Sequence, residues 1–71
     1  MKDLEVIYLC AVRYGLGRRT YISSLISDFL MTKKLSQDCK DRMIEDIESC
    51  DNLGDNCDKK NWLNLLEYLK K

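Results

Sequence analysis

The chain turns at the stretch Arg13-Tyr14-Gly15-Leu16-Gly17-Arg18-Arg19-Thr20-Tyr21, which separates two segments whose apolar residues recur at helical spacing. Gly15 predicts the end of the first segment, because a glycine readily takes the left-handed conformation just past a helix. The same stretch gathers three arginines and two tyrosines. Arginine suits forked recognition of phosphate or carboxylate, and tyrosine offers a ring for stacking. We therefore interpret this stretch as both the first junction of the fold and the binding surface.

The rest of the chain predicts further helices and no strand. Residues 2–14 and 18–33 form the first two, Ser36 caps a third, and Asp55 or Asp58 caps a fourth. The residues expected to face the core are Leu4, Ile7, Tyr8, Ala11, Val12 and Tyr14, then Tyr21, Ile22, Leu25, Ile26, Phe29 and Leu30, then Cys39, Met43, Ile44, Ile47 and Cys50, and finally Trp62, Leu63, Leu65, Leu66 and Leu69. The prediction is an all-α fold, a compact bundle of three or four short helices in one domain spanning residues 1–71.

The small size of the chain bears on its stability. A single core in 71 residues supplies about 3–5 kcal/mol, so domains of this size usually add disulfides, a metal or a partner subunit. The four cysteines form no C-x-x-C pair and histidine is absent, which gives a zinc site little support. An acidic N-terminus and the lack of a long apolar run predict a cytoplasmic protein with reduced thiols and no membrane contact. Self-association into a homo-oligomer is the expected extra source of stability.

Charge is balanced overall but unevenly distributed. Residues 1–34 carry six basic and three acidic side chains, residues 35–58 carry two and eight, and residues 59–71 carry four and one. A net charge of zero argues against long nucleic acid as the partner, since binders of extended polyanions are normally basic. A compact anion held by a few arginines remains compatible. So does pairing of acidic and basic surfaces between copies.

The candidate site follows from the chemistry of the turn. Arg18 and Arg19 would hold phosphates with help from Arg13, and Thr20 would bond a phosphate or a base edge. Either tyrosine would stack on a base, and a glycine backbone allows close approach of a ligand. The residues assigned to this site are Arg13, Tyr14, Gly17, Arg18, Arg19, Thr20, Tyr21, Asp55 and Asp58. The two aspartates would arrive through packing of the polar loop 51–58 against the turn. The competing interpretation is a plain helix junction with buried tyrosines and solvated arginines.

Catalysis and cofactor binding find little support. The glycines match neither a P-loop nor a dinucleotide fingerprint, and the aspartates of residues 51–58 lack the spacing of a calcium loop. No cysteine has an evident activating partner nearby, and the paired carboxylates lie on an acidic helical segment expected to face solvent. We expect a protein that is not an enzyme and that carries no cofactor or metal.

Two stretches resemble a pattern found in small uncharacterised proteins of phages and prophages. The stretch 13–21 resembles an R-Y-A-L-G-R-x-T-Y signature, in which Gly15 replaces the alanine. The stretch from Leu53 to Asp58, followed by Trp62, resembles a G-D-x-C-D-x-x-x-W element. The resemblance implies a short phage-encoded accessory protein in the host bacterial cytoplasm. Such proteins often counter host defence, as sponges for nucleotide signals or as blockers of a defence protein.

These observations lead to one expected function and two alternatives. The leading hypothesis is a non-catalytic, self-associating protein that sequesters a small nucleotide-type signal such as a cyclic oligonucleotide. The first alternative is an inhibitor of a host defence protein, for example a CRISPR effector, acting through its acidic helix and exposed aromatic residues. The second is a small DNA-binding regulator that uses residues 18–33 as a recognition helix, which the zero net charge disfavours.

Overall fold

The structure is a computed structural model that describes residues 2–17 and 21–71. Within them it contains four helices: α1 (Asp3–Gly15), α2 (Ile22–Met31), α3 (Gln37–Glu48) and α4 (Asn56–Leu69). The predicted all-α fold with short helices is confirmed. All regular secondary structure of the described residues is helical.

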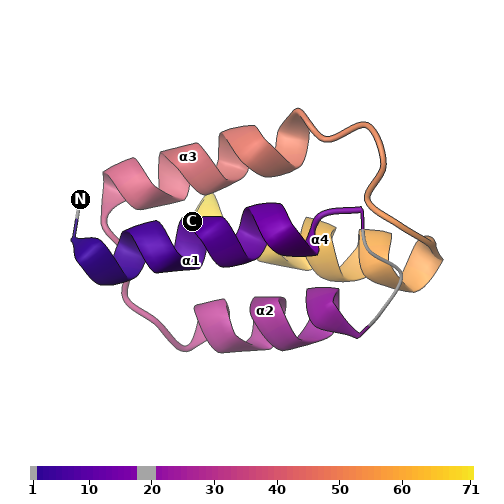
Figure 1. The fold of residues 1–71 in the computed structure, drawn as a ribbon, viewed down its shortest axis with the longest axis horizontal. Helices are drawn as coiled ribbons and strands as arrows, with labels where there is room; N and C mark the ends of the chain where they lie inside the picture. Colours follow the sequence, from indigo (N-terminus) through magenta and orange to yellow (C-terminus); the bar gives the residue numbers. More distant parts are fainter. Residues whose placement is uncertain (1, 18–20) are drawn as a thin grey trace.

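The four helices of the described residues enclose one core. In Figure 1, α1 lies in front with α3 above it and α2 below it, and α4 lies behind. Both α1 and α4 pack against α2 and against α3, so each of them bridges the other two helices. The molecule measures 31 × 21 × 20 Å. The buried apolar side chains at its centre are Leu9, Val12, Leu30, Leu35, Cys39, Met43, Ile47, Trp62, Leu65 and Leu69.

Side-chain caps define the starts of the last two helices, as the sequence predicts. Ser36 Oγ accepts a hydrogen bond from the Cys39 amide at 3.3 Å, and Asp55 Oδ1 accepts one from the Asp58 amide at 3.0 Å. Each bond satisfies a backbone donor that the first turn of a helix leaves without a partner. The cap of α4 is therefore Asp55 and not Asp58.

The end of α1 differs from the prediction. Gly15 is the last residue of the helix, and the left-handed glycine is Gly17, with φ 79°. Gly15 serves close packing instead, because a Cβ there would lie 2.6 Å from Ile26 Cδ1 and 2.9 Å from Ile22 Cγ2. The second helix is described from Ile22, later than the predicted start at residue 18. Arg18, Arg19 and Thr20 lie outside the described residues.

The predicted core stripe of α1 is partly wrong. Leu4, Ile7 and Tyr14 are exposed, whereas Leu9 and Val12 are buried. The helix is rotated from the predicted position because α1 has to face α3 as well as α2. The apolar positions of α1 therefore form two stripes, and the core takes only one of them.

The prediction for α2 is wrong in a similar way. Leu25 and Phe29, predicted to face the core, are exposed, whereas Ser23 and Ser27, outside the predicted core stripe, are buried against α4. The physical reason is a polar contact with α4. Ser23 Oγ donates to Asp58 Oδ1 at 2.6 Å, and Ser27 Oγ donates to the Asn61 carbonyl at 3.4 Å. These bonds turn the serine face of α2 inward.

The remaining helices follow their predicted patterns more closely. Met43 and Ile47 of α3 and Trp62 and Leu65 of α4 are fully buried, as predicted. Leu63 is an exception, since it is 46% exposed. Two faces of α4 are covered, one by α2 and one by α3, and Leu63 lies outside the buried face.

A buried carboxylate ties α1 to the start of α3. Glu5 accepts hydrogen bonds from the Ser36 amide at 2.7 Å, the Ser36 hydroxyl at 3.0 Å and the Lys2 amide at 3.3 Å. The Ser36 amide contributes most to lowering the pKa of Glu5 below its ordinary value of 4.5, because each donor stabilises the charged form. One glutamate thus caps α1 and holds α3 in place.

We expect Glu5→Gln to weaken the fold in a pH-dependent way. A carboxylate whose pKa is lowered by folding stabilises the native state above its unfolded pKa, and loses that contribution as the pH falls through the lowered value. The substituted protein should therefore be less stable than the parent at pH 7, and the difference should shrink below about pH 4.5. Urea denaturation across this pH range measures the effect. Glu67→Gln, at an exposed site on α4, is the matched control.

Candidate binding site at the turn between α1 and α2

The turn after α1 lies against the loop between α3 and α4. Gly17 shares a hollow of about 240 Å³ with Asn52, Gly54 and Asp55. The contact is close, since a Cβ on Gly17 would lie 3.4 Å from the Asn52 carbonyl oxygen. Segments from opposite halves of the chain thus form one surface hollow with polar groups around it.

The loop has a defined shape that presents these groups. The Asn52 side chain accepts a hydrogen bond from the Gly54 amide at 2.9 Å, which closes a tight turn. Gly54 is left-handed, with φ 96°, and a Cβ there would lie 2.7 Å from Asp58 Oδ2. The loop therefore depends on glycine at this position, and Asp55 follows at the surface as the cap of α4.

The two predicted aspartates have different surroundings. Asp55 is exposed and lines the hollow. Asp58 is 5% exposed, and its carboxylate accepts the short hydrogen bond from Ser23, whose oxygen also accepts one from Asn61 Nδ2 at 3.2 Å. Asp58 therefore links α4 to α2 in the interior. Of this pair, Asp55 is the one with a carboxylate at the surface.

Arg13 makes its interaction with α3. Its Nε donates to Asp46 Oδ2 at 2.9 Å, and this bond together with the negative charge of Asp46 raises the pKa of Arg13. Arg13 lines a separate hollow of about 410 Å³ with Arg42 and four acidic residues of α3. Since the ion pair is exposed to solvent, it holds the arginine only weakly. The structure thus places Arg13 apart from the hollow of Gly17 and Asp55.

The predicted stacking rings lie at the surface. Tyr14 is exposed near the end of α1, and Tyr21, which directly precedes α2, is 86% exposed. The interpretation of these tyrosines as core residues is therefore wrong. The residues predicted to hold phosphates, Arg18 and Arg19, and their neighbour Thr20 lie outside the described part of the chain. They follow Gly17 directly in the sequence.

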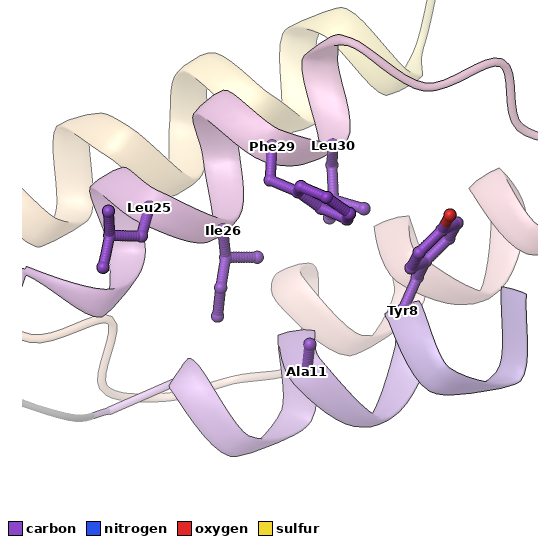
Figure 2. Close-up of a pocket in the computed structure, with 6 residues that line it drawn as sticks. All are labelled: Tyr8, Ala11, Leu25, Ile26, Phe29 and Leu30. Carbon is purple, nitrogen blue, oxygen red and sulfur yellow. The ribbon is translucent and has the colours of Figure 1, made fainter. Parts of the chain in front are cut away.

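Sequence reasoning missed an apolar groove between α1 and α2. Figure 2 shows the residues that line this hollow of about 470 Å³: Tyr8, Ala11, Leu25, Ile26, Phe29 and Leu30. The groove was missed because these positions were all expected to face the core. A pattern in α2 could have indicated the groove. Six of its ten residues are apolar, and its serines recur on one face.

Residues 2–17 and 21–71 hold no group of three or more potential ligands arranged for a metal ion. None of their helices is long and apolar enough to cross a membrane. The four cysteines are free thiols.

Comparisons with protein-family models, with curated proteins and with solved structures find no match for this chain.

Proposed function

We propose that the protein is a non-catalytic binder that captures a small nucleotide-type anion, such as a cyclic oligonucleotide, at the turn between α1 and α2. The observation that supports this most is the hollow lined by Gly17 and Asp55. Gly17 directly precedes Arg18, Arg19 and Thr20, and the exposed ring of Tyr21 follows them. A polar hollow, two adjacent cations and a stacking surface together match a phosphate joined to a base.

Each part of such a ligand has a candidate partner. Arg18 and Arg19 hold the phosphates through forked hydrogen bonds, and Thr20 adds a hydroxyl. Tyr21 stacks on a base, a contact worth roughly 1–3 kcal/mol. The exposed Asp55 accepts hydrogen bonds from a base or a ribose, and Gly17 lets the ligand approach the backbone.

The other residues predicted for the site, Asp58, Arg13 and Tyr14, support binding in this proposal without all contacting the ligand. Asp58 positions the loop through its bond to Ser23, so it acts from the interior. Arg13 is engaged by Asp46, and contributes long-range positive charge to the turn. Tyr14 offers a second exposed ring at the end of α1.

The proposed biological role rests on the phage-type signature of residues 13–21. A short phage-encoded protein that binds such a molecule without consuming it lowers its free concentration in the host bacterial cytoplasm. If that molecule is a signal of host immunity, sequestration prevents the response. The zero net charge suits a compact ligand better than long nucleic acid.

The proposal predicts a selective thermal shift with nucleotides. At about 100 times its dissociation constant, a ligand stabilises the native state by roughly 2.7 kcal/mol. In a domain of this size that corresponds to a rise in melting temperature of roughly ten degrees or more. The measurement is a melting-temperature screen of the purified protein against mono-, cyclic di- and cyclic trinucleotides.

Paired variants test the location of the site. Replacing Arg18 and Arg19 together by alanine should abolish the shift. Replacing Lys70 and Lys71 by alanine removes the same charge at the far end of α4, and should leave the shift intact. An unchanged shift in the arginine variant would place the ligand elsewhere, and a flat screen would remove the nucleotide proposal.

A second candidate function is inhibition of a host defence protein by direct contact. Two observations favour it: the exposed apolar residues of α1 and α2, and the acidic hollow on α3. Capture of a specific defence protein from host lysate, together with a flat nucleotide screen, would favour this function over sequestration of a signal.

A further inference from the structure

The surface around the groove between α1 and α2 is unusually apolar. Besides the groove-lining residues, α1 exposes Leu4, Ile7 and Tyr14 next to it, at the helical spacing i, i+3 and i+10 that aligns side chains along one side. Leu25 and Phe29 of α2 form the other side. We call these five residues, with the groove between them, the α1–α2 apolar face.

The α1–α2 apolar face is large for a chain of this length. Its five residues are between 48% and 67% exposed. Taking roughly 200 Å² for a fully exposed large apolar residue, they leave on the order of 600 Å² accessible to water. The largest apolar patch on a typical monomer is about 300–600 Å², and is often functional. The face thus stands at the upper limit for a surface that remains in contact with water.

The groove exists because a small residue lies opposite larger ones. Ala11 of α1 reaches only a short distance towards Leu25 and Ile26 of α2, and Tyr8 and Phe29 close one end with an edge-on contact at 5.5 Å between ring centroids. One helical turn before Ala11, Ile7 projects outwards. A hollow and protruding apolar side chains therefore lie side by side on the same face.

We propose that the α1–α2 apolar face binds a second copy of this chain. A two-fold axis brings the same face of two copies together, so that the protruding residues of each lie in the groove of the other. The face alone supplies most of the roughly 800 Å² that each partner buries in a stable interface, and the half-buried residues at the groove supply more.

The charge of the chain is also compatible with binding of a second copy. Positive and negative side chains balance, so two copies do not repel each other through their net charge. Charged residues border the face: Lys33 Nζ is 4.7 Å from the centroid of the Phe29 ring, and Leu4 shares a hollow with Lys2, Glu5 and Lys34. The centre of the interface is therefore apolar, and its rim is charged.

The test measures the molecular mass of the purified protein by analytical ultracentrifugation over a wide range of concentration. The expected mass is at least twice 8.4 kDa, and the melting temperature should rise with concentration, because association stabilises the folded chain by mass action. A mass of 8.4 kDa at every concentration would overturn the proposal, and would leave the face to a different protein.

Single lysine substitutions locate the interface. Ile7→Lys and Leu25→Lys should each raise the dissociation constant of the pair by about a hundredfold or more, because each places an unpaired ammonium in an apolar contact. Both sites are exposed in the single chain, so the helical circular dichroism signal should persist. Leu63→Lys, at an exposed apolar site on α4, is the matched control and should leave the association unchanged. Association that survives both face substitutions would show that copies meet through another surface.

Discussion

Trp62→Ala is expected to leave the protein largely unfolded at room temperature. Trp62 is the largest fully buried side chain, and it reaches from α4 to the end of α1, where a Cβ on Gly15 would lie 3.2 Å from its ring. Truncating a buried aromatic residue to alanine costs about 3–5 kcal/mol. That is comparable with the roughly 3–5 kcal/mol that a core of this size supplies in total.

Circular dichroism with urea denaturation measures the loss. Trp62→Phe should retain a folded chain of reduced stability, since it keeps a buried ring, and the Nε1 of Trp62 has no hydrogen-bond partner among the described residues. Leu63→Ala, at the next position, should cost less than about 0.5 kcal/mol because that side chain is half exposed. A Trp62→Ala protein that melts within a few degrees of the parent would contradict the placement of this residue at the centre of the core.

Ser23→Ala has the second largest expected effect. The change removes the hydroxyl that donates to the buried Asp58 carboxylate at 2.6 Å, and leaves that carboxylate without this hydrogen bond. Leaving a buried polar group without its partner costs about 1–3 kcal/mol, and more for a charged one. With about 4–8 °C per kcal/mol, the melting temperature should fall by roughly ten degrees.

Ser27→Ala is the matched control for this prediction. Ser27 is buried one turn further along the same face of α2, but its hydroxyl donates to a helix carbonyl at the long distance of 3.4 Å. Its loss should cost less than about 1 kcal/mol. Equal melting temperatures for the two variants would mean that the carboxylate of Asp58 does not depend on Ser23. Since the Asp58 side chain lies against Gly54 of the loop beside the turn, Ser23→Ala should also weaken the binding of any ligand there.

Local signals in the sequence identified the helices, and the starts of α3 and α4, well. Ser36 and Asp55 are good caps by their chemistry alone, and each contacts a backbone amide three residues away. The buried positions of α3 also followed from spacing, because the apolar residues of that helix form a single stripe among charged ones. When one face of a helix is apolar and the rest is charged, only the apolar face can be buried, so the rotation of the helix is determined.

The candidate site was predictable only in part. The glycines and the polar loop indicated a turn and a surface, and Gly17 and Asp55 line one hollow. No local pattern indicated that Asp58 bonds to Ser23 or that Arg13 pairs with Asp46, since these partners lie 35 and 33 residues apart. Contacts at such separation depend on how the helices pack, which no local pattern specifies.

The sequence by itself determined that the chain is helical, where α3 and α4 begin, and most of the residues that form the core faces of these two helices. Only the tertiary structure decided which faces of α1 and α2 are buried. Both helices have more apolar positions than one contact can cover, so spacing alone allows several rotations of each. The observed rotation gives each buried carboxylate a hydrogen-bond donor, which it requires. Ser36 donates to Glu5, and Ser23 donates to Asp58. This rotation of α1 and α2 leaves the α1–α2 apolar face exposed.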